Sequence, residues 1–206
     1  MSVAFKVSNR VERMKRGVPF SISGFYALGS RTSVHKALSR LAQEGVVVRV
    51  SKGIYVRPKP LPSMPSIKTI ASAEQVAKVW AKEHGYKLVS QGQEAAYRLG
   101  LQTQAPMRTI FWSNGPSRQF KVGNEVVEVR HITEQKLRWG NGPEGALLRG
   151  LLVTPPESVE VSSLKAAFSR LSLSSSEIRE ILHKLSVLPL LHAWQNKFRQ
   201  LEQTAL

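Results

Sequence analysis

The chain has 206 residues with 42% apolar content, which suits a folded protein of one or two domains. It contains no Cys, which excludes disulfides and thiolate metal sites and is compatible with a reducing cytoplasm. Asp is absent too, and all 14 acidic residues are Glu scattered along the chain. Enzymes that transfer phosphoryl or nucleotidyl groups usually hold Mg²⁺ with paired carboxylates, so this composition disfavours them.

Positive charge is concentrated in the first third of the chain. The net charge is +16, and residues 1–60 hold 12 Lys and Arg against 2 Glu, a net of +10. Residues 61–206 hold 18 Lys and Arg against 12 Glu, a net of +6. Such a basic segment matches nucleic acid or an anionic membrane. No apolar run is long enough to span a bilayer, and the N-terminus lacks a signal-peptide core. We therefore expect double-stranded DNA as partner, no membrane, and a cytoplasmic location.

Apolar residues recur at helical spacing near the N-terminus, which predicts a helix over residues 3–15 that ends before Gly17. Basic residues occupy the other positions of this helix. Arg10 and Arg13 could contact phosphates, but solvent exposure is an equal alternative. The apolar positions are Val3, Val7, Val11 and Met14.

The pattern of residues 19–58 predicts a winged helix-turn-helix. A short helical piece over 25–28 is followed by Gly29, which supplies the turn, and Ser30 is placed to cap the next helix. Gly45 ends that helix in the position that favours a left-handed residue. Val34, Ala37, Leu38, Leu41 and Ala42 form its single apolar stripe. Two β-branched segments, 46–50 and 54–56, then flank a turn and predict a hairpin, the wing.

The outward side of the second helix carries the candidate chemistry, because early residues of such a helix reach base edges first. Arg31 can donate two hydrogen bonds to a guanine edge, and Thr32 and Ser33 suit bases or phosphates. Lys36 and Arg40 are better placed for the backbone. The alternative is a solvated face on an ordinary helix. The candidate DNA-binding residues are Arg31, Thr32, Ser33, His35, Lys36, Ser39, Arg40 and, at the tip of the wing, Lys52.

A proline-rich segment at 59–66 is predicted to be a linker, because its prolines favour an extended chain without ladder hydrogen bonds. It separates a DNA-binding domain at 1–58 from a second domain at 67–206; the alternative is a surface loop within one domain. The second domain alternates helices and strands at first, then continues as an antiparallel hairpin over 118–122 and 125–132. From residue 158 onward the chain is expected to be helical. The predicted fold class is therefore α+β, with a small antiparallel sheet and a helical C-terminal segment.

We expect no catalytic residues, no metal and no cofactor. The five His residues are far apart and lack metal-ligand spacing. No Ser lies in a nucleophile-elbow context, and the glycine-containing segments at 91–93 and 140–145 lack the ending of a phosphate-binding loop.

Two stretches of the second domain resemble a known family. They are Gln91-Gly92-Gln93-Glu94-Ala95-Ala96-Tyr97-Arg98-Leu99-Gly100-Leu101-Gln102-Thr103-Gln104 and Thr109-Ile110-Phe111-Trp112-Ser113-Asn114-Gly115-Pro116-Ser117-Arg118. Together they resemble the AbiEi-type antitoxins of bacterial type IV toxin–antitoxin systems, which also carry a winged helix-turn-helix ahead of this region. We refer to residues 91–118 as the middle motif. Its glycines and Pro116 are expected to serve turn geometry, and Arg98 and Arg118 to bind anions or form ion pairs.

The resemblance implies a transcriptional autorepressor that also acts in phage defence. The N-terminal domain would repress its own operon at an operator with inverted repeats, with a homodimer possible on DNA. The second domain would counteract a nucleotidyltransferase toxin. The alternatives are a kinase or nucleotidyltransferase-like enzyme that modifies its partner, and an RNA-binding module.

Overall fold

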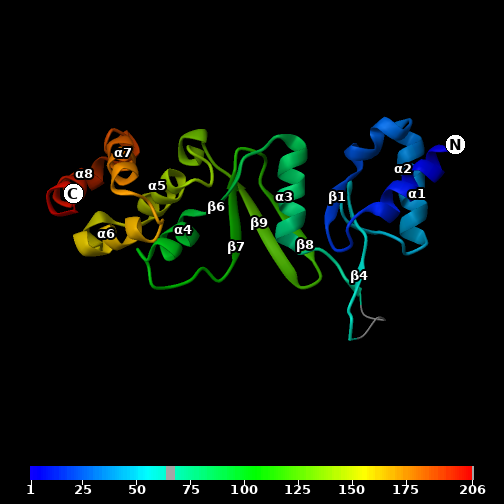
Figure 1. The fold of residues 1–206 in the computed structure, drawn as a ribbon, viewed down its shortest axis with the longest axis horizontal. Helices are drawn as coiled ribbons and strands as arrows, with labels where there is room; N and C mark the ends of the chain where they lie inside the picture. The colour runs from blue at the N-terminus through cyan, green and yellow to red at the C-terminus, as the bar shows by residue number, and fades with distance from the viewer. Residues whose placement is uncertain (64–67, 206) are drawn as a thin grey trace. The chain divides into compact units, whose positions relative to one another are not determined.

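The computed structural model describes residues 1–63 and 68–205, and the chain is an α+β protein (Figure 1). Its internal contacts divide it into two compact units. The first unit comprises residues 1–86 and 118–129, and the second comprises 87–117 and 130–206. Each unit is described by itself below.

The first unit begins with a helix, a short strand, a 3-10 helix and a second helix, followed by a hairpin. β3 lies between β1 and β2 in an antiparallel sheet, with Val56 opposite both Pro19 and Val48. The later elements of this unit are a long helix, α3, and the β8–β9 hairpin, whose last strand ends in the second unit. The bounds are α1 Val3–Arg13, β1 Pro19–Ser21, η1 Ile22–Leu28, α2 Arg31–Gln43, β2 Val48–Ser51, β3 Ile54–Val56, β4 Lys59–Pro60, β5 Lys68–Thr69, α3 Ala73–His84, β8 Arg118–Val122 and β9 Glu125–His131.

The core of the first unit lies where α1 and α2 face η1 and the sheet. Val7 and Val11 of α1 are fully buried, as are Val34 and Leu38 of α2. This confirms the predicted apolar stripes on both helices. Burying four such aliphatic side chains contributes roughly 1.5–3 kcal/mol each, so the orientation of α2 is firmly set.

The first helix is shorter than predicted, because it ends at Arg13 instead of residue 15. Met14 has an extended backbone, and the Arg57 guanidinium donates hydrogen bonds to the carbonyl oxygens of Glu12 and Met14. A side chain from far along the chain therefore satisfies carbonyls that a further helical turn would have used.

The first strand of the hairpin begins two residues later than predicted. The N–H groups of Val46 and Val47 both donate to the carbonyl of Leu41, so these residues complete the end of α2. Gly45 has φ of +72°, as expected for a left-handed helix terminator. The pairing of β2 with β3 is irregular between Arg49 and Ser51.

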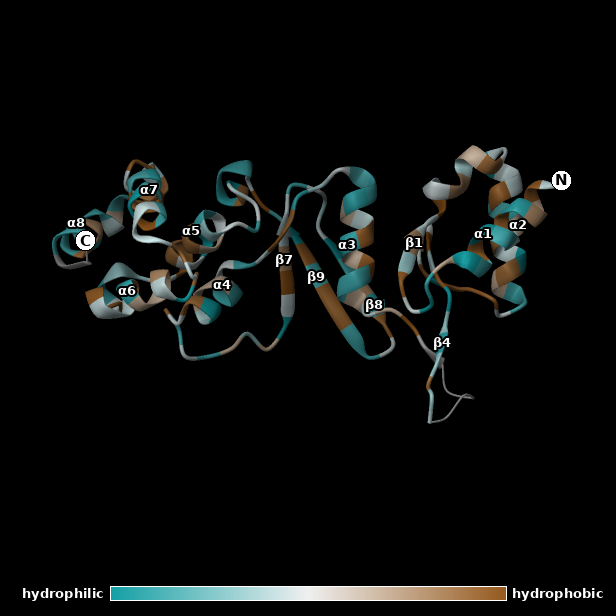
Figure 2. Cartoon of the chain, viewed as in Figure 1, coloured by the Kyte–Doolittle hydropathy of each residue, from teal (hydrophilic) through white to brown (hydrophobic). Residues whose placement is uncertain are grey.

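Hydrogen bonds from a nearby residue and from a distant one fix the start of α3. Ser72 and Gln75 form a reciprocal capping box, and the Glu125 carboxylate accepts a hydrogen bond from the N–H of Ala73 at 2.9 Å. Further along, the Trp80 ring packs against Phe120 of β8, with ring centroids 5.4 Å apart. The alternation of hydrophobic and hydrophilic residues along α3 is visible in Figure 2. The hairpin is therefore tied to α3 by both polar and aromatic contacts.

The second unit is mainly helical, with one antiparallel strand pair in which Val89 of β6 lies opposite Trp112 of β7. Its core contains Leu147, Leu164 and Leu185, each fully buried. The C-terminal segment is helical apart from short turns, as expected. The bounds are β6 Leu88–Ser90, α4 Gly92–Leu99, β7 Thr109–Ser113, η2 Glu134–Leu137, α5 Pro143–Val153, η3 Pro156–Ser158, α6 Val161–Ser169, α7 Ser175–Ser186, η4 Pro189–Trp194 and α8 Gln195–Ala205.

Two glycines of the second unit are required for different reasons. A Cβ on Gly92 would lie 2.5 Å from Val153 Cγ1 and 2.7 Å from the Arg149 carbonyl oxygen. Gly92 has no left-handed backbone, so helix packing, and not the turn geometry expected from sequence, requires glycine there. Gly100 does have φ of +74°, and a Cβ there would also collide with the Arg170 guanidinium.

Arg149 of α5 is the largest fully buried side chain of the second unit, with 1% of its surface exposed. Its guanidinium donates to the carbonyl of Gly140, while its Nε has no hydrogen-bond partner among the described residues. Burial lowers the pKa of this guanidinium to about 10. The Nε is therefore a buried donor without a partner, which costs about 1–3 kcal/mol.

The predicted linker is only partly covered, since its residues 64–66 lie outside the described residues. On either side of the gap, β4 and β5 pair antiparallel, with Lys59 opposite Thr69 and Pro60 opposite Lys68. The division into domains at 1–58 and 67–206 stays a prediction.

Gly92→Ala should destabilise the second unit by about 1–3 kcal/mol, because the added methyl group meets backbone and a branched side chain at the α4–α5 contact. Urea unfolding followed by tryptophan fluorescence measures the change. Gly24→Ala is the matched control, since a Cβ there meets no atom within 4 Å. Equal losses in both variants would contradict the packing explanation.

Candidate nucleic-acid interface

The candidate residues of α2 lie on the side of the helix opposite the buried stripe. Arg31 and Thr32 open the helix and are exposed, and Lys36 and Ser39 continue the exposed surface one and two turns later. None of the eight candidates is buried. The exposed ones are Arg31, Thr32, His35, Lys36, Ser39, Arg40 and Lys52, and Ser33 is half-buried.

Ser33 has a structural partner at the start of α2. The Ser30 hydroxyl oxygen accepts a hydrogen bond from the Ser33 N–H at 3.2 Å and donates to the Ser33 hydroxyl at 2.9 Å. Ser30 is therefore the cap that the sequence predicted. The Ser33 hydroxyl is engaged with this cap, which makes it a positioning group for the first turn.

Tyr26 of η1 lies between two candidate residues and was missed in the sequence analysis. The Arg31 guanidinium carbon is 5.1 Å from the centre of the Tyr26 ring, within the range of a cation–π interaction. The Tyr26 hydroxyl lies 3.4 Å from His35 Nε2. Tyr26 thus holds both side chains on one side of α2. An aromatic residue five positions before Arg31, in the helix preceding the turn, was the available signal.

Arg40 is paired within its own helix. Its Nε lies 2.8 Å from the Glu44 carboxylate, and 75% of the Arg40 side chain is exposed. An exposed pair of this type contributes about 0–1 kcal/mol. A phosphate group would therefore have to compete with only a weak internal partner.

Lys52 occupies the tip of the β2–β3 hairpin. The following residue, Gly53, has φ of +75°, and its carbonyl accepts a hydrogen bond from the Ile22 N–H at 2.8 Å. This contact ties the hairpin tip to the start of η1. The Lys52 side chain is exposed and extends from a fixed turn.

The middle motif has a structural explanation of its own within the second unit. Asn114 accepts a hydrogen bond from the Lys87 N–H and donates to Glu134, both at 2.8 Å. Lys87 Nζ also contacts Glu134 at 2.6 Å, and the hydrogen bonds from Lys87 and then Asn114 lower the pKa of that carboxyl group. Asn114 therefore fixes the turn after β7.

Both arginines singled out in the middle motif have protein partners. Arg98 pairs with Glu94 at 2.6 Å on the surface of α4. The Arg118 guanidinium carbon lies 5.3 Å from the Phe120 ring centre and 5.8 Å from that of Trp80. Of the two expected roles, these contacts favour the structural one.

In the part of the chain that the structure describes, no three His, Cys, Asp or Glu side chains are grouped to hold a metal ion. None of the helices in that part is both long and apolar enough to cross a bilayer.

Residues 6–145, about two thirds of the chain, match the model of a family described as "Family of unknown function (DUF6088)". The chain belongs to this family. Membership in DUF6088 assigns no activity, so the resemblance to AbiEi-type antitoxins stays a prediction.

No curated protein matches the chain. Among solved structures, a match is the "Crystal structure of RV2827C protein from Mycobacterium tuberculosis", 17% identical, covering 95% of this chain and 78% of that chain, with a TM-score of 0.45. Similarity at that level carries no functional argument.

Ser30→Ala should lower the free energy of unfolding by about 1 kcal/mol, because it removes the hydrogen bond that caps α2. Thermal unfolding followed by circular dichroism measures the change. Ser39→Ala replaces an exposed Ser in the interior of the same helix and should have little effect or be slightly stabilising. A larger loss from Ser39→Ala than from Ser30→Ala would argue against the capping role.

Proposed function

We propose that the chain is a sequence-specific DNA-binding repressor and the antitoxin of a type IV toxin–antitoxin module. In this proposal, residues 19–58 act as a winged helix-turn-helix. The observation that carries it is the exposure of the polar and basic face of α2 while Val34, Leu38 and Leu41 on the other face are buried. A helix presented in this way fits the major groove of B-form DNA.

The early residues of α2 would read bases. Arg31 is held by the Tyr26 ring, so less side-chain entropy is lost when its guanidinium binds a guanine edge. Thr32 is exposed in the same turn, and His35 Nε2 lies 3.4 Å from the Tyr26 hydroxyl. Lys36, Ser39, Arg40 and Lys52 would contact phosphates and set the register of the helix on the duplex.

An operator with inverted repeats, occupied by a homodimer or by two copies, would provide the affinity that one half-site lacks. Support for the antitoxin role comes from the likeness of the middle motif to AbiEi-type antitoxins. We propose a cytoplasmic protein that counteracts a nucleotidyltransferase toxin by binding, without catalysis of its own.

The antitoxin role is tested by co-expression with the product of the neighbouring gene in a bacterial host. Growth arrest by that product alone, relieved by this chain, is the expected result. Incubating both proteins with labelled ATP separates the alternatives. Transfer of label to the partner that depends on this chain would replace the binding proposal with an enzymatic one, and a neighbour without toxicity would refute the antitoxin role.

Arg31→Ala should weaken binding to the operator by about 1–3 kcal/mol and relax selection at one base pair, because it removes a two-bond contact to a base edge. Fluorescence anisotropy with DNA from upstream of the chain's own gene, compared with a random duplex, gives both affinities. Equal losses on the two duplexes would refute base reading by Arg31. No binding of the parent protein to either duplex would refute the whole proposal.

Lys36→Ala and Lys52→Ala should each weaken binding to operator and random duplex alike. Each should also reduce the slope of log K against log salt concentration by about 0.9, the contribution of one phosphate contact. Salt titrations of both variants measure this slope. A loss confined to the operator would instead place the altered side chain at a base.

A further inference from the structure

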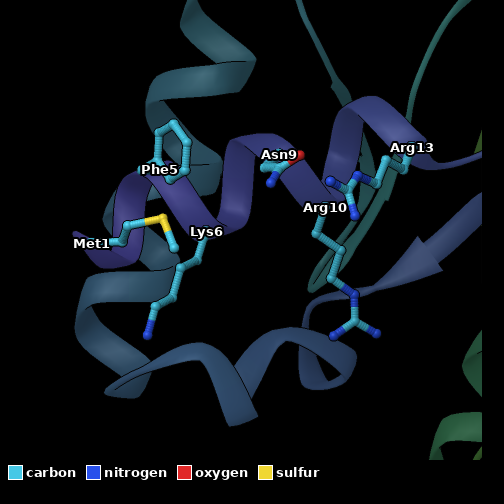
Figure 3. A pocket seen from close by; sticks show the side chains of 6 residues that line it. All are labelled: Met1, Phe5, Lys6, Asn9, Arg10 and Arg13. Atoms are coloured by element: carbon cyan, nitrogen blue, oxygen red, sulfur yellow. The ribbon is translucent and has the colours of Figure 1, made fainter.

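A shallow hollow of about 280 Å³ lies on the outer side of α1 (Figure 3). Its lining includes three cations but no carboxylate: Met1, Phe5, Lys6, Asn9, Arg10 and Arg13. All three cations are exposed. The one acidic residue of α1, Glu12, is not among the lining residues and accepts a hydrogen bond from Ser8 instead.

The three cations follow one another along the helix. Lys6, Arg10 and Arg13 are spaced by four and three residues, so they occupy neighbouring positions on one face. Figure 3 shows the side chains of Lys6 and Arg10 directed to the same side of α1. Like charges at this spacing repel one another, and a bound anion would relieve that repulsion.

Arg10 is held in place by the core. Its guanidinium carbon lies 4.9 Å from the centre of the Phe25 ring, and Phe25 is 1% exposed. The middle member of the row is thus anchored on η1, the element that leads into α2. The row and the candidate face of α2 belong to the same compact unit.

We infer that Lys6, Arg10 and Arg13 form a second binding surface for the phosphodiester backbone of duplex DNA. The inference rests on the proposed function and adds a site to it. With a rise of 1.5 Å per residue, the row from Lys6 to Arg13 is about 10 Å long. Phosphates follow one another at regular intervals along each strand of B-form DNA, so a row of cations of this length can contact more than one phosphate. Asn9 adds a donor between the first two cations.

The test uses the full chain with Lys6→Gln and Arg13→Gln combined. Arg10 is left unchanged, because its guanidinium packs on a core ring. The matched control is Lys15→Gln with Lys82→Gln, which removes the same charge from exposed positions of the same unit outside the hollow. Thermal unfolding confirms that both variants are folded, since Arg13 also lies in the last turn of α1 where cations favour the helix dipole.

The expected result is a fall in affinity on the order of 10-fold or more at about 0.1 M salt, on random duplex and operator alike, for the Lys6/Arg13 variant only. Its slope of log K against log salt should decrease by about 0.9 for each phosphate that is no longer neutralised. An unchanged slope, or an equal decrease in the control, would overturn the inference. The same holds if the variant keeps its duplex affinity but loses binding to vesicles containing phosphatidylserine, since the surface would then serve a membrane.

These outcomes are distinct from a failure of the proposed function. If the parent protein binds duplex and Arg31→Ala weakens that binding, while Lys6→Gln with Arg13→Gln does not, only the inference about α1 fails. If the parent protein binds no duplex at all, both fail together.

Discussion

The contact between the apolar faces of α1 and α2 determines where the charged residues of the first unit can lie. Val7 and Val11 on one helix and Val34 and Leu38 on the other are fully buried. Because side chains on a helix repeat every 3.6 residues, burial of these positions forces the intervening polar residues to the outside. The exposed face of α2 and the basic row on α1 are both consequences of this one packing arrangement.

A different constraint organises the second unit. There α4 and α5 approach so closely that Gly92 has no space for a methyl group. Protein interiors are packed as densely as organic crystals, so a helix contact of this kind depends on small residues at defined positions. The middle motif therefore encodes a packing surface, and Asn114 fixes the turn that follows β7.

Much of the fold could be predicted because its signals are local. Ser30 caps α2, and Gly45 follows the end of that helix in the left-handed conformation, as the sequence predicted. Such signals depend on residues within one helical turn, so the sequence displays them directly. The α+β class and the helical C-terminal segment follow from the same periodicities.

What the sequence did not reveal depends on residues far apart in the chain. Arg57, more than forty residues after α1, donates hydrogen bonds to the carbonyl groups at the end of that helix. Gly92 is required because Val153 and Arg149 leave no space for a side chain there. The same reason hid part of the candidate interface. Tyr26 becomes relevant only when η1 and α2 are folded together, and the contact of Arg10 with the Phe25 ring forms only when α1 lies against η1.

Hydrogen bonds at the end of α1 link this helix to the residues that follow β3. The Arg57 guanidinium holds carbonyls of α1, Gly17 N–H donates to the Arg57 carbonyl, and Arg16 donates to the carbonyl of Pro58. Hydrogen bonds donated by each segment to the other therefore hold the end of α1 and the residues after β3 together. A ligand that contacted α1 and the hairpin together would find them already held relative to each other, so less conformational entropy would be lost on binding.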